Sequence, residues 1–325
     1  MKLDTSALLQ PERLVFPPPW IGHIPFAAWA IVHLRPRLLV ELGTHSGNSY
    51  CAFCQSILEN GIDARAFAVD TWEGDEHAFE YGEEVLVDLS QHHDVRFKHF
   101  STLLQMRFDD AASRFGDGTV DLLHIDGLHT YDAVRHDFDT WLPKVSKRGV
   151  VLLHDTHVHE RNFGVHRLLE ELQSDYPAFS FPHSHGLGVV LVGDERDSTL
   201  LQACTDSSKA AELHSAFARL GAAIQYRYEL EALKPELAQT SAQLDAHRRS
   251  VHEFSLLVQE LRSSEAELRL QMQRKSRDLE ALETVLDAVR SELREAQAAG
   301  ATLGRSVPLQ KGIARLHRRS GTEDN

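Results

Sequence analysis

Short apolar segments with the length of buried strands alternate with amphipathic segments through the first part of the chain. A continuous Leu/Val run bounded by glycine is typical of a strand that is buried on both faces, as parallel strands are. We expect strands at residues 38–42, 64–69, 95–100, 120–125 and 150–153, and a closing hairpin at 179–193. We expect helices at residues 22–33, 50–58, 103–114, 132–141 and 164–172. This alternation predicts an α/β fold with a Rossmann-like, doubly wound and mostly parallel sheet.

The hydrophobic period changes in the second half of the chain, where Ala, Glu, Leu, Gln and Arg dominate. From Pro235, which suits the first turn of a helix, apolar residues follow a heptad repeat. One core position holds Leu237, Leu244, Val251, Val258, Met272, Leu279, Leu286 and Leu293; the other holds Phe254, Leu261, Leu268, Leu282, Val289 and Ala296. Thr240, His247, Glu265 and Lys275 interrupt this seam. The pattern predicts a rod roughly 95 Å long.

A single helix with this stripe would expose its apolar face to water. We therefore expect the rod to self-associate as a coiled coil, which makes the chain a homo-oligomer, either a dimer or a trimer. The alternative is a helical hairpin that folds on itself or on the first domain. The absence of Gly and Pro between Pro235 and Gly300 favours the rod.

These patterns divide the chain into five parts. We expect an N-terminal arm at 1–20, the α/β domain at 21–195, a helical linker at 196–234, the coiled coil at 235–300 and a flexible basic tail at 301–325. Apolar and basic residues are mixed over 305–319, which allows a weak amphipathic contact with an anionic membrane, a docking site for a partner, or a disordered tail. The composition favours the disordered tail.

Charge and cysteine content narrow the class of protein. The 48 acidic and 34 basic residues give a net charge of −14, which argues against a nucleic-acid partner, because phosphate neutralisation needs clustered Lys and Arg. Only three cysteines occur, so no disulfide framework is expected. The N-terminus lacks a signal-peptide core, and no apolar run is long enough to span a bilayer. We expect a cytoplasmic protein without a transmembrane segment.

The first expected strand ends in a glycine-bearing turn with the pattern Glu41-x-Gly43-x-x-x-Gly47. A dinucleotide-binding turn has the pattern G-x-G-x-x-G, so that a pyrophosphate can approach the helix N-terminus. Glu41 would repel a pyrophosphate, whereas it suits a ligand with ammonium or sulfonium groups and free hydroxyls. Thr44 and Ser49 belong to the same turn and are further candidate ligand contacts. The alternative is a generic tight turn between a strand and a helix.

The ends of the next two expected strands also carry candidate binding residues. Asp70 closes the second strand, where an acidic residue typically accepts hydrogen bonds from ribose hydroxyls. Thr71 and Trp72 follow, and the indole is a candidate to flank an adenine ring. Ser101 follows the expected third strand, at a position that often contacts adenine in this fold. The loop 73–82 is acidic and is a candidate border of the substrate site.

Acidic residues and a histidine follow the fourth and fifth expected strands. Asp126 comes directly after the fourth strand, and His154 and Asp155 end the fifth. Because the carboxyl ends of parallel strands meet at one edge, these side chains should lie close together. Two carboxylates and an imidazole suit a divalent cation, although the acids could instead cap the following helices. Both neighbours, His154 and Asp155, can be ligands only if the backbone leaves the strand there.

His129 follows Asp126 by three residues, in the loop at the same edge. An imidazole with a pKa near 6.5 can take a proton from an alcohol as that alcohol acts as a nucleophile. A coordinated cation would acidify that alcohol. His129 is therefore the candidate catalytic base.

Taken together, these motifs resemble a bacterial group of class I S-adenosylmethionine (SAM) methyltransferases. The motifs are Glu41-x-Gly43-x-x-x-Gly47, Asp70-Thr71-Trp72, Ile125-Asp126-Gly127-x-His129-x-Tyr131, Trp141-x-Pro143, Gly149 and His154-Asp155. The group is related to metal-dependent sugar O-methyltransferases of the macrocin and mycinamicin type, to aminocoumarin methyltransferases and to cephalosporin hydroxylase-like domains. The resemblance covers about residues 20–195.

The resemblance implies specific roles. Glu41, Gly43, Gly47, Asp70 and Asp126 would contact SAM, Asp126 and the pair His154-Asp155 would bind magnesium, and His129 would be the base. The departure is His154, because the relatives have an acidic residue there. An imidazole ligand shifts the expectation from magnesium toward manganese, iron or another transition metal.

The sequence thus predicts a SAM-dependent, metal-assisted O-methyltransferase that acts on a hydroxyl of a sugar in a glycan, glycolipid or glycosylated metabolite. One alternative is a scaffold with an inactive methyltransferase-like domain, which would bind SAM without transferring methyl groups. The other is a metal-dependent hydroxylase-like enzyme, which would consume oxygen and not need SAM.

Overall fold

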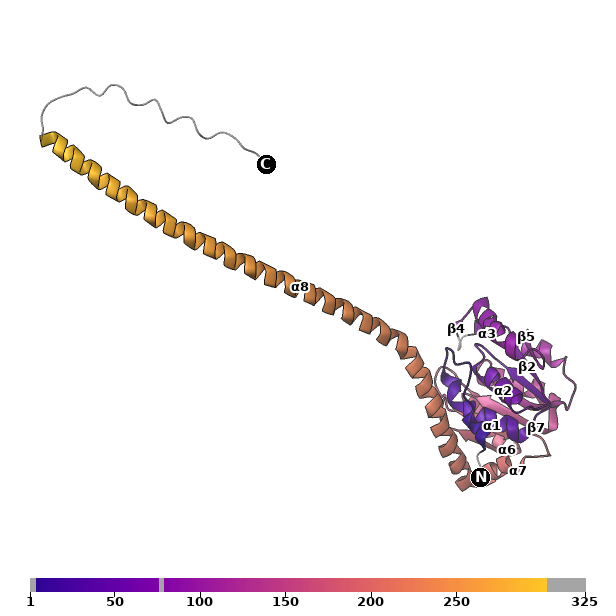
Figure 1. Cartoon of the computed structure of the whole chain (residues 1–325). Coiled ribbons are helices and arrows are strands. Elements are labelled where there is room, and N and C mark those ends of the chain that lie inside the picture. Colours follow the sequence, from indigo (N-terminus) through magenta and orange to yellow (C-terminus); the bar gives the residue numbers. More distant parts are fainter. Residues whose placement is uncertain (1–3, 76–78, 303–325) are drawn as a thin grey trace. The chain divides into compact units, whose positions relative to one another are not determined.

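The computed structural model describes residues 4–75 and 79–302 of the chain (Figure 1). The chain divides into two units, one that ends at Leu237 and one that begins at Ala238. The sheet that organises the first unit contains strands β1 (Leu38–Leu42), β2 (Arg65–Asp70), β5 (Ser101–Gln105), β6 (Val120–Ile125), β7 (Val145–His154), β8 (Ala178–Phe181) and β9 (Leu187–Leu191). A separate two-stranded sheet pairs β3 (Gly74–Asp75) with β4 (Phe79–Glu80).

The order of the strands in the main sheet is β5-β2-β1-β6-β7-β9-β8. Neighbours from β5 to β7 run parallel, whereas β9 is antiparallel to both β7 and β8. Every residue of β6 is buried, as expected for a central strand covered on both faces. The predicted doubly wound, mostly parallel sheet with a closing hairpin at its edge is confirmed.

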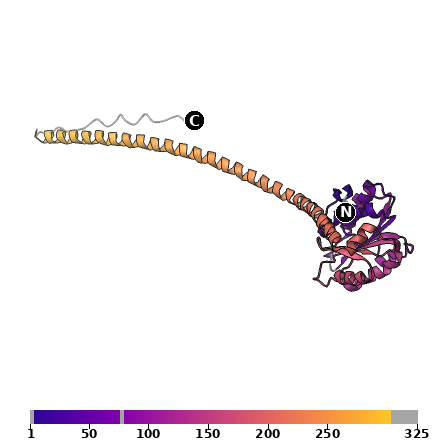
Figure 2. The ribbon, with the colours of Figure 1, turned by 90° about the horizontal axis from the view of Figure 1, so that it is seen from below.

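Helices cover both faces of this sheet (Figures 1 and 2). The helices are η1 (Thr5–Leu8), η2 (Pro19–His23), α1 (Ile24–Leu34), α2 (Asn48–Glu59), α3 (Glu83–Arg96), α4 (Phe108–Ala112), α5 (Tyr131–Trp141), η3 (Leu142–Lys144), α6 (Val165–Asp175), α7 (Ser198–Thr205) and α8 (Ser207–Thr302). The elements η1, α1, α2, α3, α7 and the start of α8 share one apolar core with one face of the sheet. The other face packs against α4, α5 and α6.

The start of α8 belongs to the core of the first unit. Leu213, Phe217 and Ile224 are buried there. Gly221 lies so close to Gly22 that an added Cβ would be 2.0 Å from the Gly22 carbonyl oxygen. The segment that we expected to be a helical linker, 196–234, therefore packs into this unit over most of its length, up to Tyr228. The unit itself ends at Leu237.

Two elements differ from the sequence-based expectation. Residues 95–100, expected to be the third strand, form the end of α3 and a turn, and the strand is β5. The expectation was wrong because helix α3 has a mixed polar and apolar pattern, in which no helical period stands out. Consequently the expected helix at 103–114 is also shorter and is represented by α4.

Pro235 does not begin a helix, because it lies within α8. Proline lacks the N–H that would bond to the carbonyl one turn earlier, so the helix loses one hydrogen bond there and continues. Residues 303–325, where a basic tail was expected, and residues 76–78 of the acidic loop lie outside the described residues. None of the described helices is both long and apolar enough to cross a membrane.

Candidate functional site

The turn after β1 is built around a close contact between two neighbouring strands. Gly43 has φ +84°, and a Cβ on it would be 2.1 Å from the backbone oxygen of Asp126. Gly43 N donates to Val69 O, and Asp126 N donates to Leu42 O, which ties the ends of β1, β2 and β6 together. Gly47, with φ +83°, is the N-cap residue directly before α2. Only glycine allows this approach at position 43.

Asp70 fixes the conformation of the same turn. Its Oδ2 accepts hydrogen bonds from the backbone N–H groups of Thr44 and His45, both at 2.8 Å. Its Oδ1 accepts a third from Trp72 N at 2.8 Å. The carboxylate also lines a cavity beside the turn, so it is placed where a bound ligand would contact it.

This first cavity has a volume of about 400 Å³ and lies at the carboxyl ends of β1, β2 and β6. Five of the predicted site residues line it: Gly43, Asp70, Thr71, Asp126 and His129. Phe108 and Asp137 close it from α4 and α5, two contributions that the sequence did not reveal. Little in the sequence indicated Phe108 and Asp137, because each belongs to a helix and does not follow directly after a strand.

A second cavity, of about 300 Å³, adjoins the first. Its lining includes Thr44 from the glycine turn, Ser49 from the first turn of α2, and Trp20, Arg161 and Phe163 from other segments. Gly43, His45, Asp126 and His129 line both cavities. The two cavities therefore meet at these residues.

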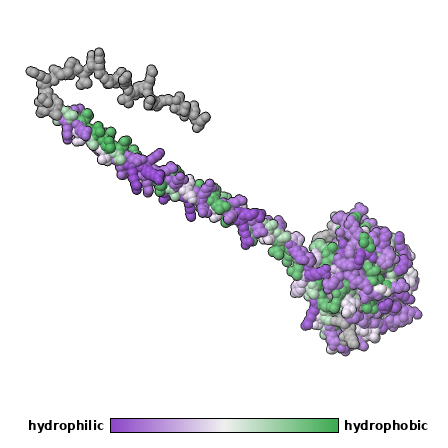
Figure 3. All heavy atoms as spheres, in the orientation of Figure 1, coloured by the Kyte–Doolittle hydropathy of each residue, from purple (hydrophilic) through white to green (hydrophobic). Residues whose placement is uncertain are grey.

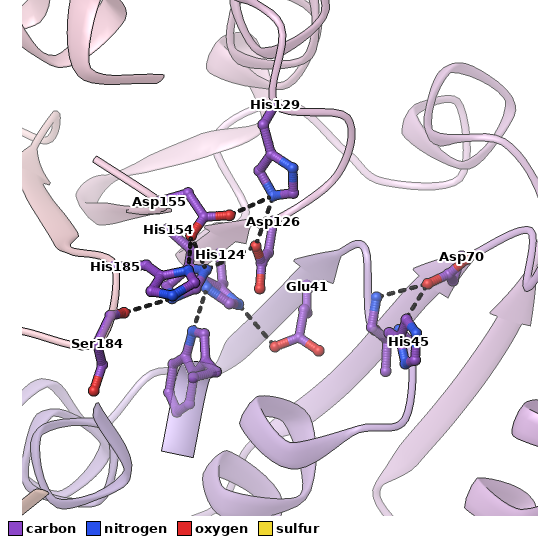
Figure 4. Close-up of polar contacts among 12 residues, drawn as sticks. Glu41, His45, Asp70, His124, Asp126, His129, His154, Asp155, Ser184 and His185 are labelled. Carbon is purple, nitrogen blue, oxygen red and sulfur yellow. Dashed lines mark hydrogen bonds and ion pairs between the residues drawn. The ribbon is translucent and has the colours of Figure 1, made fainter. Parts of the chain in front are cut away.

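The three predicted cation ligands come together where the cavities meet (Figure 4). One donor atom from each of Asp126, His154 and Asp155 lies within 4.8 Å of the others. His154 is the last residue of β7, and Asp155 has φ +59°, so the backbone leaves the strand between them. This change of direction lets two consecutive side chains face the same point.

The hydrogen bonds of His154 determine which nitrogen faces the carboxylates. Its Nε2 lies 3.1 Å from the Ser184 carbonyl oxygen, to which it can only donate. Its Nδ1 lies 3.1 Å from Asp126 Oδ1. A carbonyl that holds one N–H of an imidazole leaves the other nitrogen available as a ligand, which is the usual arrangement around protein-bound metals.

His129 bridges both carboxylates. Its Nε2 lies 3.0 Å from Asp155 Oδ2 and 3.3 Å from Asp126 Oδ1. The ring stacks on Phe163, with centroids 4.7 Å apart and planes 6° from parallel. Burial alone would lower the pKa of His129, but the hydrogen bonds and charges of the two carboxylates outweigh burial and raise it to about 10.

The pKa values of the other titratable groups in the cluster also shift so that the charged forms are favoured. Burial would lower the pKa of His154, but the charges of Asp126 and Asp155 raise it to about 9. Burial opposes ionisation of Asp126 and Asp155, yet His154 and His129 hold the pKa of both carboxyls below the usual range. In this state two imidazolium groups neutralise two carboxylates. A divalent cation would compete with those two protons for the same oxygens.

His185 joins the cluster from the turn of the closing hairpin. From the sequence, this turn could be a solvated loop, which was favoured, or could border the substrate. Its Nδ1 lies 3.2 Å from Asp155 Oδ1, and it lines the second cavity. Ser184, His185 and Gly186 all have positive φ, so the turn between β8 and β9 bends toward the end of β7. The sequence could have indicated His185 only through the turn of the expected hairpin, in which it lies.

Glu41 does not line either cavity. The side chain is fully buried, and Oε2 accepts a hydrogen bond from His124 Nδ1 at 2.8 Å. Trp20 Nε1 donates to His124 Nε2 at 3.1 Å, so the three residues form a buried chain of hydrogen bonds. The second carboxylate oxygen has no partner among the described residues. The sequence placed Glu41 at the right strand but did not reveal His124.

Trp72 and Ser101 lie away from the cavities. Trp72 is 2% exposed, and its φ of +54° turns the indole under the glycine turn, where Nε1 donates to His45 O. Ser101 begins β5, whereas the cavities lie at the opposite ends of the strands. Its hydroxyl contacts Tyr50 at 2.6 Å and His93 at 2.8 Å in the buried interior. The expectation for Ser101 depended on the misplaced third strand.

Asp137 is a buried acid in the wall of the first cavity. It is 8% exposed, and its carboxyl group forms no hydrogen bond within the described residues. Burial raises its pKa to about 7, and the nearby Asp109 adds to the effect against the opposing charge of His136. A carboxyl group that is easily protonated therefore faces the cavity.

Comparisons with known proteins agree with the class of domain. Residues 40–156 match the family model described as "Methyltransferase domain". The chain is 45% identical over 195 residues to the uncharacterized protein y4gI of Sinorhizobium fredii. That alignment covers 60% of this chain but 21% of the relative, so the chain spans about a fifth of the length of the protein it matches.

Solved structures with a similar arrangement include two O-methyltransferases. A "putative caffeoyl-CoA O-methyltransferase" from Staphylococcus aureus is 17% identical, with a TM-score of 0.42 over 52% of this chain and 81% of its own. TomG from Streptomyces achromogenes, solved with SAM, is 15% identical, with a TM-score of 0.42 over 56% and 83% of the two chains.

Proposed function

We propose that the chain is a SAM-dependent O-methyltransferase that is assisted by a divalent cation and acts on a hydroxyl of a sugar in a glycan, glycolipid or glycosylated metabolite. The observation that carries this proposal is the junction of the two cavities at Asp126 and His129, beside the cluster of Asp126, His154 and Asp155. The match of residues 40–156 to a methyltransferase domain supports the reaction class.

The first cavity suits the nucleoside part of SAM. Asp70 and Thr71 lie at the end of β2, where a carboxylate can accept hydrogen bonds from ribose hydroxyls. Gly43, Asp70, Thr71 and Asp126, four of the predicted cofactor contacts, line this cavity. The methyl donor would then lie beside Gly43, where the cavities join.

The donor set at the cluster suits a divalent cation. Two carboxylates with low pKa values supply oxygen ligands, and His154 presents Nδ1 while Ser184 holds Nε2. Magnesium prefers oxygen ligands, so the imidazole favours manganese, iron or another transition metal. Asp126, His154 and Asp155 are the proposed ligands.

The second cavity is the proposed acceptor site. Its volume of about 300 Å³ and its aromatic and polar lining, with Trp20, Phe163 and Arg161, are compatible with a sugar ring. When bound, SAM supplies an activated methyl group, and the cation neutralises the carboxylates and polarises the acceptor hydroxyl. His129, once relieved of that negative charge, accepts the hydroxyl proton, and its stacking on Phe163 fixes the ring.

The test is transfer of a labelled methyl group from SAM to a panel of glycans and glycosylated metabolites. We expect transfer by the wild type, loss of transfer on chelation and rescue by added Mn²⁺ or Mg²⁺. Replacing His129 by Gln should slow transfer about 100- to 10,000-fold, the usual contribution of a general base. His99→Gln, an exposed histidine outside both cavities, is the matched control.

Two results would contradict the proposal. SAM binding without transfer to any acceptor would indicate the inactive scaffold. Oxygen consumption that needs the cation but not SAM would indicate the hydroxylase-like reaction.

A further inference from the structure

The seam of apolar residues along α8 is exposed throughout the second unit. Leu244, Phe254, Met272 and Leu282 are 52%, 68%, 72% and 65% exposed. Apolar patches recur along this helix in the space-filling view (Figure 3). Among the described residues of this unit no side chain covers the seam, because all side chains described there are exposed.

We propose that residues 244–296 of α8 pair with a second copy of this chain as an antiparallel two-stranded coiled coil, centred on residue 270. The proposal concerns a surface outside the catalytic unit and does not depend on methyl transfer. It follows from the positions of two charged residues in the seam and of two apolar residues beside it.

The charged residues in the seam decide the orientation. Glu265 occupies the same core position as Val258 and Met272. Lys275 occupies the other core position, between Leu268 and Leu282. In a parallel coiled coil each core position faces the same position of the partner. No parallel register can therefore bring Glu265 and Lys275 together, and the in-register pair would place each against its own like charge.

In an antiparallel pair the two core positions face each other. With residue 270 at the centre, Glu265 faces Lys275 of the partner subunit, and by two-fold symmetry the contact occurs twice. Shifting either chain by a heptad would place both charges against apolar residues. Within the described residues Glu265 pairs only with Arg269 of its own chain, and Lys275 forms no ion pair. Both charges therefore retain the capacity to pair across the interface.

The same register matches the apolar residues along the seam. Residues equally distant from position 270 on opposite sides face each other, and most of the resulting pairs are apolar. They are Leu268 with Met272, Leu261 with Leu279, Val258 with Leu282, Phe254 with Leu286, Val251 with Val289 and Leu244 with Ala296. His247, the other polar seam residue in this range, faces Leu293.

The residues that flank the seam provide a second, independent match. Leu257 and Val285 occupy the same flanking position of the heptad, and both are exposed, at 50% and 60%. In the antiparallel register Leu257 faces Val285 of the partner subunit, which widens the apolar interface. In a parallel pair they would instead face the cationic side chains Arg262 and Arg290. Charge and hydrophobic contacts therefore favour the same orientation.

Charge reversal in the full-length chain tests the orientation by its effect on dimerisation. Glu265→Lys places Lys opposite Lys275 of the partner subunit in two symmetric layers, so we expect the dimer Kd to rise about 100-fold. The double variant Glu265→Lys with Lys275→Glu restores both pairs and should restore the wild-type Kd. Sedimentation equilibrium provides the measurement. In a parallel dimer position 265 faces its own copy, so Glu265→Lys would replace a Glu–Glu contact by a Lys–Lys contact, and the Kd would change little. An unchanged Kd in the single variant would therefore overturn the proposal.

Spin labels provide a direct measure of the geometry. The label is attached to a cysteine that replaces one exposed serine, either Ser255 or Ser276. The Cys204→Ser substitution removes the one cysteine that is not buried, and Cys51 and Cys54 are buried and so protected from the label. At 1.5 Å per residue, the antiparallel register predicts interchain separations along the axis of about 45 Å at position 255 and about 18 Å at position 276. Electron–electron double resonance measures both. A short distance of about 20 Å or less at both positions, a trimer or a monomer would overturn the proposal.

Discussion

His129 connects the two cavities, and its protonation state depends on the charge beside it. With the carboxylates of Asp126 and Asp155 beside Nε2, the ring keeps a proton to high pH, since its pKa is about 10. A protonated imidazole cannot accept a proton from an acceptor hydroxyl. The proposed role of His129 therefore requires a cation at the two carboxylates, which lowers the pKa of the ring.

Asp137 allows a prediction about stability and pH. Its pKa in the folded protein is about 7, above the ordinary value of 3.8, because the carboxyl is buried. The folded state thus binds the proton more tightly than the unfolded state, and stability falls as pH rises from about 4 to 7. Replacing Asp137 by Asn should stabilise the protein by up to about 4 kcal/mol above pH 7 and have no effect below pH 4.

Urea unfolding at a series of pH values measures this difference. Asp139→Asn is the matched control, because Asp139 lies on the same helix, is exposed and pairs with Arg135 at 2.8 Å. A surface pair of this kind contributes less than about 1 kcal/mol. An Asp137→Asn variant that is no more stable than the wild type at pH 8 would show that the buried carboxyl is not destabilising.

The sequence predicted the location of site residues where strand ends determine it. Asp126, His154 and Asp155 meet because parallel strands bring their carboxyl ends to one edge. The strand positions did not predict the direction in which Glu41 and Trp72 point, and both side chains point away from the cavities. Glu41 points into the interior toward His124. Trp72 turns under the glycine loop because its backbone is left-handed.

At the scale of elements, the unit formed by β1, the glycine turn and α2 positions the site. The turn needs glycine at position 43, where an added Cβ would collide with the backbone of Asp126. Gly43→Ala should therefore destabilise the protein and also displace Asp126. Positive φ alone costs an alanine about 1–2 kcal/mol, and the collision adds about 1–3 kcal/mol.

Gly118→Ala separates these two contributions. Gly118 has φ +69° but no heavy atom within 4 Å of an added Cβ, so only the backbone cost applies. Urea unfolding of both variants provides the comparison. Equal losses of stability would mean that the end of β6 can move away from Gly43 without cost, and that the contact does not fix the position of Asp126.

Elements were predictable where a single period dominated the sequence. The strands β1, β2 and β6 lie within one residue of their predicted bounds. Strand β7 contains the predicted segment 150–153 but begins earlier, at Val145, where its residues are more polar. Helix α3 was missed because its apolar residues are sparse, and only Leu89 and His93 are buried on it. That omission moved the third strand and, with it, the expected contact at Ser101.

At the scale of the whole molecule, the chain combines an α/β unit with a second unit whose described part is a long exposed helix. The heptad repeat and a helical segment before it were visible in the sequence. The sequence did not show that this segment packs in the core of the first unit and continues through Pro235 as one helix. Self-association and its orientation remain proposals that depend on the seam of α8. The proposed methyl transfer concerns the cavities and the cluster of the first unit.

The central claim is that one edge of the sheet holds a SAM cavity and a cation cluster side by side. Calorimetric titration of the metal-free protein with SAM and with Mn²⁺ tests it most directly. We predict that both bind, that Mn²⁺ binding releases protons at pH 7 because it displaces them from His129 and His154, and that Asp155→Asn loses Mn²⁺ binding while still binding SAM. Failure of the wild type to bind SAM, or Mn²⁺ binding that Asp155→Asn leaves unchanged, would contradict the account.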